Sequence, residues 1–509
     1  MNILVVTRIL GLLLALFSLT MLPPVVVSWF YNDGAWLAFA EAFAIILVTG
    51  LAVFLPLRRH RAELRIRDGF LVVAGFWVLL GIAGGIPLVL VEIPIMSFTE
   101  AVFESVSGFT TTGATVLVGL DTLPRSVLWY RQQTQWFGGM GIIVLAVAIL
   151  PVLGVGGMQL YRAETPGPMK DTKLTPRITE TAKALWITYV GLTAVCAISY
   201  RLAGMTWFDA ICHAFSSVST AGFSTHDASF AYFDSALLEW LGALFMFLGA
   251  TSFALHYYAM RRIMPDIRLE HGAGLPRFRW PHRRKVSLAA AIGGYFQDPE
   301  FRAFMLLQAV LMAIIAGYLA LKGHHTPGES MTKAVFHAVS IGTTSGFVSA
   351  DFSAWPGALP VLLILASFIG GCAGSTAGGM KVLRWLLIVK QGWRELARLL
   401  HPNAVMSVRL GERAVPTRVA EAVWGFFSVY IIVFGVLMAM MMFIGLDQIT
   451  AFSSIAATLN NLGPGLGDVS STFGTVPETA QWVGILAMIL GRLEIFTLLV
   501  LFTPEFWRR

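Results

Sequence analysis

Charged residues are scarce in this sequence. Only 13% of its 509 residues are Asp, Glu, Lys or Arg, against roughly a quarter in an ordinary soluble domain, and 56% are hydrophobic. A soluble chain of this length would need several polar domain surfaces, which this composition cannot supply. Apolar runs of roughly 18 or more residues recur throughout, each long enough to cross about 30 Å of hydrocarbon. The sequence therefore predicts an all-α polytopic membrane protein. The runs lack a period-2 alternation, which excludes a transmembrane β-barrel.

Cysteine and catalytic motifs are also scarce. Cys196, Cys212 and Cys372 are odd in number and widely spaced, so they predict neither a disulfide framework nor a zinc site. No HExxH and no GxSxG motif occurs, so we expect neither an enzyme nor a bound cofactor. His213 and His337 stand at equivalent places in a repeat described below, which favours capping or packing over metal binding. The net charge of +7 lies in short basic segments between apolar runs, which does not indicate a nucleic-acid partner.

Ten apolar segments are candidate spans. They lie at about 9–30, 35–57, 70–91, 136–154, 184–203, 236–260, 303–321, 358–390, 419–445 and 479–503. The first has no small-residue cleavage site, so we expect it to be retained rather than removed as a signal peptide. The basic stretches fall on one side of the membrane if both termini are cytoplasmic. These stretches are Arg58 to Arg67, Arg162 to Arg177, Arg261 to Lys285, Arg394 to Arg418, and Arg508 with Arg509. On the outer side, we expect Glu100, Asp227 and Asp351 to concentrate cations.

A repeated motif follows four of the spans. Short apolar segments at about 96–109, 206–219, 331–342 and 448–459 cannot cross a bilayer, and we interpret them as re-entrant half-helices. They lead into FESVSGFTTTGAT (Phe103 to Thr115), HAFSSVSTAGFST (His213 to Thr225), HAVSIGTTSGFVS (His337 to Ser349) and SIAATLNNLGPGLG (Ser454 to Gly467). The aligned glycines are Gly113, Gly222, Gly346 and Gly463, which recur every 109 to 124 residues.

Each unit is predicted to be a span, a half-helix, a glycine-containing loop and a second span. Four such units around one axis would bring four loops together. Each half-helix would point the negative end of its dipole towards the membrane centre, and the loop carbonyls would replace the water shell of a monovalent cation. A single Ser/Thr/Gly patch would fit ordinary close packing between helices better. Four patches in register favour a filter.

The motifs GFTTTGAT, STAGFST and TTSGF resemble the superfamily of K⁺ transporters that includes TrkH, KtrB and the fungal Trk proteins. The resemblance extends from about residue 70 to the C-terminus, and the two additional N-terminal spans are similar to the TrkH branch. It implies K⁺ uptake across the bacterial inner membrane, with the transported ion bound in a filter. The implied filter residues are Thr111, Thr112, Gly113, Thr220, Ala221, Gly222, Thr344, Ser345, Gly346, Asn461, Leu462 and Gly463. The fourth loop departs from the Thr-x-Gly form.

The eighth candidate span is interrupted by a run of glycines and small residues from Gly370 to Gly379. Each glycine costs roughly 0.8–1 kcal/mol relative to Ala in a helix, so a continuous helix is disfavoured. A phosphate-binding loop is a poor match, because Met380 stands where such a loop has Lys. We expect Lys381 to be a solvated anchor.

The resemblance implies that this segment is an intramembrane gate beneath the filter, with Arg492 projecting into the pore beside it. The implied gate residues are Gly370, Gly371, Gly374, Ser375, Thr376, Gly378, Gly379 and Arg492. The alternative for Arg492 is a pairing with a carboxylate elsewhere in the bundle, because an unpaired charge at membrane depth is costly.

The expected organisation is two N-terminal helices (1–67) and four pore repeats (68–160, 161–265, 266–400 with the interrupted span, and 401–509). The resemblance adds a homodimer and a separate cytoplasmic TrkA-type subunit that binds a nucleotide, since this chain shows no such domain. Three other functions stay open at this point. They are a secondary transporter that couples a monovalent cation to H⁺ or Na⁺, a transporter of a larger solute, and a membrane enzyme acting on a lipid-like substrate.

Overall fold

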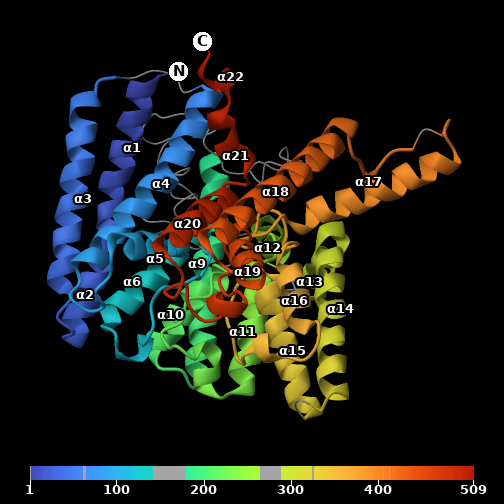
Figure 1. Cartoon of the computed structure of the whole chain (residues 1–509), viewed down its shortest axis with the longest axis horizontal. Coiled ribbons are helices and arrows are strands. Elements are labelled where there is room, and N and C mark those ends of the chain that lie inside the picture. The colour runs from blue at the N-terminus through green and yellow to red at the C-terminus, as the bar shows by residue number, and fades with distance from the viewer. Residues whose placement is uncertain are drawn as a thin grey trace, which may run out of the picture.

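The computed structural model describes residues 2–60, 65–141, 178–263, 288–323, 326–404, 406–411 and 413–508. These residues are almost wholly helical (Figure 1). The exception within these ranges is a two-stranded antiparallel hairpin of β1 (Arg409–Leu410) and β2 (Arg413–Ala414). The later part of the predicted fourth span, the basic stretch Arg162 to Arg177 and most of the stretch Arg261 to Lys285 lie outside the described residues.

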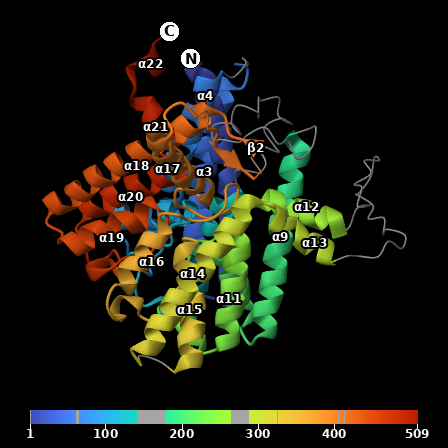
Figure 2. The same ribbon diagram turned by 90° about the vertical axis from the view of Figure 1, so that its right-hand side faces the viewer.

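The described part contains six helices long and apolar enough to cross a membrane. The first is α1 (Ile3–Ser18) continued by α2 (Leu22–Tyr31). The others are α3 (Trp36–Leu57), α4 (Ile66–Leu90), α9 (Ile178–Leu202), α14 (Pro299–Leu321) and α18 (Thr417–Ile444). In two views, α9, α11, α14 and α15 run side by side, and both termini lie at the same end of the molecule (Figures 1 and 2).

Two predicted spans are bent where we expected continuous helices. The segment 236–260 is α11 (Ala236–Gly249) followed at 96° by α12 (Phe253–Ile263). The segment 479–503 is α20 (Glu478–Arg492), which meets α21 (Phe496–Leu499) and the turn after it at 104°. Glu494 and Ile495 both have positive φ, which ends α20. Hydropathy did not reveal either bend, because the few polar residues at the breaks, Thr251 and Ser252 in the first and Arg492 and Glu494 in the second, do not interrupt a long apolar run.

The first break is explained by backbone hydrogen bonds. When α11 ends, its last carbonyls lose their helical partners. The glycine-rich segment supplies new ones, because the N–H groups of Cys372 and Thr376 donate to the carbonyls of Ala250 (2.9 Å) and Gly249 (3.2 Å). In return, Phe253 N–H donates to the Gly374 carbonyl (3.1 Å). The bend in one span and the interruption of another therefore stabilise each other.

One further span is interrupted where the sequence predicts it, and another differs from the prediction. The segment 358–390 is α16 (Leu359–Ser367), a non-helical stretch and α17 (Val382–Leu400), which extends away from the body in Figure 1. The predicted span 136–154 is preceded by α6 (Arg125–Trp136) and a single π-helical turn (Phe137–Gly141). Helix α6 has a polar sequence that nonetheless lies buried, so hydropathy placed the start of this element too late.

Four short helices follow the spans at the predicted places: α5 (Phe98–Phe109), α10 (Trp207–Val218), α15 (Pro327–Gly342) and α19 (Gln448–Leu459). Each begins at a residue whose side chain accepts a hydrogen bond from a first-turn N–H, namely Ser97, Thr206, Thr326 and Asp447. Each packs against the span before it and against a helix of a neighbouring unit. The pairs are α5 with α4 and α20, α10 with α9 and α6, α15 with α14 and α11, and α19 with α18 and α16. Because α5 contacts α20, the chain closes on itself.

Candidate functional site

The four short helices lead into four buried loops with one shared conformation. We define loops 1 to 4 as residues 110–116, 219–225, 343–349 and 460–466. The second residue of each loop is left-handed although it is not glycine: Thr111 (φ 55°), Thr220 (51°), Thr344 (59°) and Asn461 (54°). The N–H of the next residue then bonds back to a carbonyl of the helix, over 2.7 to 3.0 Å. Left-handed residues other than glycine cost of order 1–3 kcal/mol each and cluster at functional sites.

The glycines of the four loops form a closed ring of contacts. Each has positive φ, and each faces the carbonyl of the residue that precedes the glycine of the next loop. A Cβ on Gly113 would lie 2.0 Å from the Ala221 oxygen, and one on Gly222 would lie 2.1 Å from the Ser345 oxygen. For Gly346 the distance is 2.1 Å to the Leu462 oxygen, and for Gly463 it is 2.7 Å to the Thr112 oxygen. Loop 4 therefore closes on loop 1, with more room at that joint.

A cavity of about 530 Å³ lies on one side of this ring. All four ring glycines line it, together with the carboxyl-bearing residues Asp227 and Asp351. Glu100 is not among the lining residues, because its carboxylate accepts the backbone N–H of Ser97 at the start of α5. Two of the three acids expected at the mouth therefore border the cavity.

The glycine-rich loop and Arg492 contact the loops from the side of their left-handed residues. Nη1 of Arg492 donates to Thr111 Oγ1 (3.0 Å), and Thr220 Oγ1 lies 3.1 Å from Thr376 Oγ1. The N–H of Gly378 donates to Thr344 Oγ1 (2.7 Å). In loop 4, the N–H of Gly379 donates to the Asn460 carbonyl (3.0 Å). The structure thus brings all four loops into contact with the glycine-rich loop or Arg492, and two of these contacts join residues more than 100 positions apart.

Arg492 stands at the end of α20, where the chain bends. Besides Thr111 it donates to the carbonyls of Thr376 (3.1 Å) and Gly139 (2.9 Å), and to that of Gly138. It therefore links loop 1, the glycine-rich loop and the π-helical turn after α6. Glu494, two residues further on, forms an ion pair with Arg384 of α17.

Sequence reasoning missed the residues that hold the glycine-rich loop. One carboxylate oxygen of the buried Glu300 on α14 accepts the N–H groups of both Ala373 (2.7 Å) and Leu383 (3.1 Å). Lys381 is not the solvated anchor that we expected. It is partly buried and donates to the Ala377 carbonyl within the same loop. The signal for Glu300 was an acid in the first turn of an apolar span, two residues after the capping Asp298.

A cluster of ionisable groups lies beside the cavity. His226 lines the cavity, and its ring nitrogens face the carboxylates of Asp121 and Asp209, the second at 3.4 Å. Burial of His226 opposes its charged form, but hydrogen bonds to the two carboxylates and their charges outweigh it and raise its pKa. Within the described ranges, no group of three or more His, Cys, Asp or Glu is arranged to hold a metal ion. His213 and His337 serve as hydrogen-bonding partners of Ser224 Oγ (3.0 Å) and the Ala350 carbonyl (3.1 Å).

Apolar spans around a buried ring of loops, with a cavity on one side and a polar plug on the other, define a polytopic membrane transport protein. The family model described as "TrkH: Cation transport protein" matches residues 37–509. The chain belongs to this family, which is a family of transporters and not of enzymes.

The relatives cover the whole chain. The chain is 54% identical over 509 residues to the Trk system potassium uptake protein TrkH of Halomonas elongata, covering 100% of both chains. It is 51% identical to the protein of the same name from Escherichia coli K12, over 99% of both chains. The crystal structure of the potassium transporter TrkH from Vibrio parahaemolyticus matches with a TM-score of 0.87 and 50% identity, over 100% of both chains.

Proposed function

We propose that this chain takes up K⁺ across the bacterial inner membrane through the ring of loops 1 to 4. The observation that carries the proposal is the closed cycle of glycine–carbonyl contacts, in which each loop packs against the next and the fourth against the first. Four backbone loops around one axis offer carbonyl oxygens in place of the water shell of K⁺. The names of the relatives, which are potassium uptake proteins, support the same ion.

The proposed K⁺-binding residues are those that the sequence motifs indicated. Thr111 to Gly113, Thr220 to Gly222, Thr344 to Gly346 and Asn461 to Gly463 would supply the carbonyls. The wider joint at Gly463 fits the departure of loop 4 from the Thr-x-Gly form. Loop 4 would therefore contribute less to discrimination between ions than the other three loops.

The glycine-rich loop and Arg492 together form the proposed gate. The loop would block the path sterically, and the guanidinium would raise the electrostatic barrier to a cation. Its hydrogen bonds to Thr111 and Thr376 support this role, because they place the charge against both the filter loop and the plug. Opening would require these bonds and those of Glu300 to rearrange.

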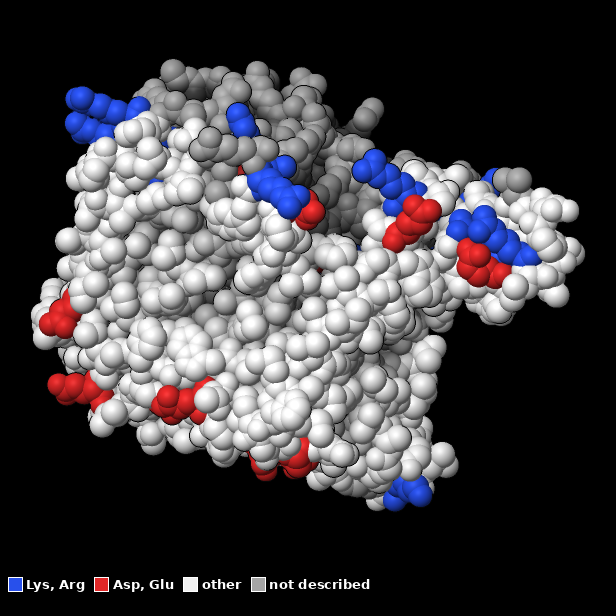
Figure 3. All heavy atoms as spheres, turned by 45° about the horizontal axis from the view of Figure 1, so that its top comes forward, with Lys and Arg blue, Asp and Glu red and all other residues white. Residues whose placement is uncertain are grey.

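The proposed orientation places both termini in the cytoplasm. Lys and Arg gather towards the end of the molecule that carries the termini, and most of the visible Asp and Glu lie towards the opposite edge (Figure 3). Cytoplasmic loops carry the excess of basic residues. The division into residues 1–67 and four pore repeats, the homodimer and the control by a TrkA-type nucleotide-binding subunit belong to the same proposal.

The direct test is uptake of ⁸⁶Rb⁺, a K⁺ tracer, by a host that lacks its own K⁺ uptake systems. Expression of the chain should restore both uptake and growth at low K⁺, and an absence of both would overturn the proposal. Purified protein in liposomes then separates the modes of transport. Flux driven by a K⁺ gradient alone supports a channel-like path, whereas flux that needs a Na⁺ or H⁺ gradient supports the coupled alternative.

A further inference from the structure

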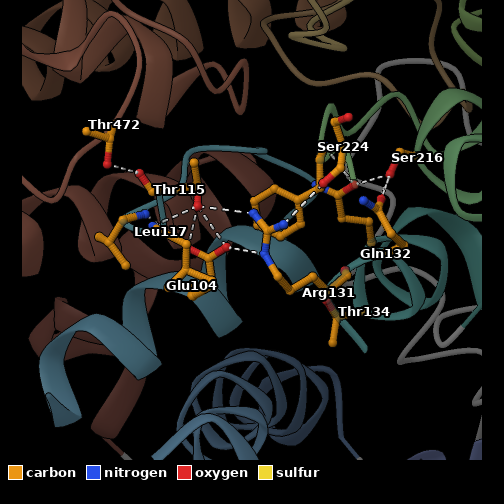
Figure 4. Close-up of polar contacts among 12 residues, drawn as sticks. Glu104, Thr115, Leu117, Arg131, Gln132, Thr134, Ser216, Ser224 and Thr472 are labelled. Carbon is orange, nitrogen blue, oxygen red and sulfur yellow. Dashed lines mark hydrogen bonds and ion pairs between the residues drawn. The ribbon is translucent and has the colours of Figure 1, made fainter. Parts of the chain in front are cut away.

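A buried ion pair lies directly behind loops 1 and 2. Arg131 on α6 is 2% exposed and Glu104 on α5 is 1% exposed, and Nε of the arginine lies 2.6 Å from Oε1 of the carboxylate. Figure 4 shows Arg131 between Glu104 on one side and Ser224 on the other. Arg131 also lines the cavity beside the ring. A cation transport protein thus places a permanent positive charge in the wall through which cations would enter.

Glu104 binds the residues of loop 1 that follow its glycine. Its carboxylate accepts the Thr115 hydroxyl (3.0 Å) and the Val116 N–H (3.1 Å). The equivalent positions on α10 and α15 are His213 and His337. Their rings form hydrogen bonds to residues that follow the glycines of loops 2 and 3. Because loop 1 uses a carboxylate where those two loops use an imidazole, it buries a negative charge that needs a counter-charge.

Arg131 supplies that charge and also reaches loop 2. Its Nη1 donates to the Ser224 carbonyl (3.3 Å) and its Nη2 to Thr115 Oγ1 (3.1 Å). The guanidinium carbon lies 4.2 Å from the centre of the Phe223 ring, within the range of a cation–π contact. One planar group therefore contacts both loops, two residues beyond the glycine in each, next to the tight joint of Gly113 with Ala221.

Helix α6 supports loop 2 at a second place. The side chain of Gln135, one turn after Arg131, donates to the Ala221 carbonyl (2.9 Å) and accepts the Phe223 N–H (3.1 Å), on either side of Gly222. Loop 2 is thus fixed to α6, and Arg131 extends that fixed surface to loop 1. This explains why a polar helix lies buried at this position.

We propose that Arg131 and Glu104 are positioning residues that set the spacing between loops 1 and 2 and thereby the ion selectivity of the filter. The proposal rests on the function proposed above. Each charge has a defined part: Glu104 fixes loop 1 and neutralises Arg131, and Arg131 joins loop 1 to loop 2. Neither residue touches the ion. The three nitrogens of the guanidinium are essential, because each donates to a different partner and a lysine, with a single ammonium, cannot span the same three partners.

The test compares two variants with the wild type by the ratio of ⁸⁶Rb⁺ to ²²Na⁺ flux in liposomes, normalised to folded protein. Arg131→Lys keeps the charge, and the double variant Glu104→Gln with Arg131→Met removes both charges together. Each should lower the ratio roughly threefold to tenfold, the effect of losing one or two ordinary hydrogen bonds. Arg131→Met alone strands a buried carboxylate and is expected to fold poorly, so the double variant keeps the proposal testable.

The matched control is the partly buried ion pair of Arg384 on α17 with Glu494, which has the same chemistry but joins a different pair of elements. The double variant Arg384→Met with Glu494→Gln should leave the flux ratio unchanged. A wild-type ratio in Arg131→Lys and in the Glu104–Arg131 double variant would overturn the proposal.

Gly113→Ser in the same assay shows whether a negative result contradicts only the positioning role or the proposed filter as well. If Gly113→Ser lowers the ratio and the pair variants do not, only the positioning role falls. If none of them lowers the ratio, the filter itself is wrong and the positioning role falls with it.

Discussion

Four residues of the loops have a left-handed backbone conformation that side chains other than glycine rarely adopt. Thr111, Thr220, Thr344 and Asn461 take left-handed backbone angles, and their side chains point to Arg492, to the glycine-rich loop or to α20. The hydroxyls and the amide supply hydrogen bonds that glycine could not make. These hydrogen bonds explain why the strained conformation is kept, because they connect the four loops to Arg492, the glycine-rich loop and α20.

The first prediction concerns the ring glycines. Gly113→Ala should lower the ⁸⁶Rb⁺/²²Na⁺ flux ratio more than Gly463→Ala. A Cβ at residue 113 would stand 2.0 Å from a backbone oxygen, against 2.7 Å at residue 463, and the overpacking should cost about 1–3 kcal/mol. Tracer flux in liposomes measures the ratio, and size-exclusion profiles verify folding. Equal ratios in the two variants would contradict the ring of contacts.

The second prediction concerns His226 and pH. The pKa of His226 is raised in the folded protein, so its paired, charged form stabilises the fold fully below its ordinary pKa of 6.5. That contribution is lost as the pH rises through the raised value. At pH 5.5 the wild type should be more stable than His226→Gln by about 1 kcal/mol in the free energy of unfolding, and its melting temperature should be higher accordingly. The difference in melting temperature should shrink by pH 9. A difference that grows with pH would contradict the pairing with Asp121 and Asp209.

At the scale of elements, the broken helices belong together. The carbonyls released where α11 ends accept hydrogen bonds from the glycine-rich loop, and the end of α20 places Arg492 against the same loop. Glu300 of α14 then holds the loop at Ala373 and just beyond it at Leu383. Three elements from different parts of the chain thus hold the glycine-rich loop in place, which is the proposed barrier.

The third prediction concerns this barrier. Arg492→Ala should increase K⁺ flux per folded protein because it removes the fixed charge, and Glu300→Ala should do so because it frees the loop. The double variant should be less than additive, since both changes lower one barrier. Glu300→Gln is the matched control, because its amide oxygen still accepts the backbone N–H groups. Lower flux together with lower yield in Arg492→Ala would instead indicate a structural pairing role.

At the scale of the whole molecule, charge is segregated. Lys and Arg gather towards the end that carries the termini, and most of the visible Asp and Glu lie towards the opposite edge. Asp227 and Asp351 line the cavity beside the ring. In the proposed orientation, these charges would set up a field along the ion path. Such a field raises the local concentration of cations without binding them tightly.

The fourth prediction tests that field. Asp227→Asn with Asp351→Asn should raise the apparent KM for K⁺ roughly two- to fivefold at about 10 mM ionic strength. The effect should be smaller at about 150 mM, because the Debye length falls from about 30 Å to about 8 Å. Glu100→Gln is the control, since Glu100 does not line the cavity. An equal change in KM at both ionic strengths would contradict a field effect.

Local pattern alone determined much of this protein. Hydropathy located the spans, and the short helices were evident from their length and from first-turn signals such as Ser97 and Thr326. The aligned glycines predicted four equivalent loops. These features depend on residues close to one another in the chain, so periodicity and spacing reveal them.

Tertiary structure decided the rest. The bends after Gly249 and Arg492 were not predictable, because they depend on hydrogen bonds to a loop more than 100 residues away. Hydropathy predicts a span only from residue 136 and so misses α6, although Arg131 is fully enclosed by partners from α5, loop 1 and loop 2. Burial of a charge is decided by the counter-charge that folding brings beside it. The sequence shows that Arg131 is charged, but only the folded structure shows that Glu104 is its partner.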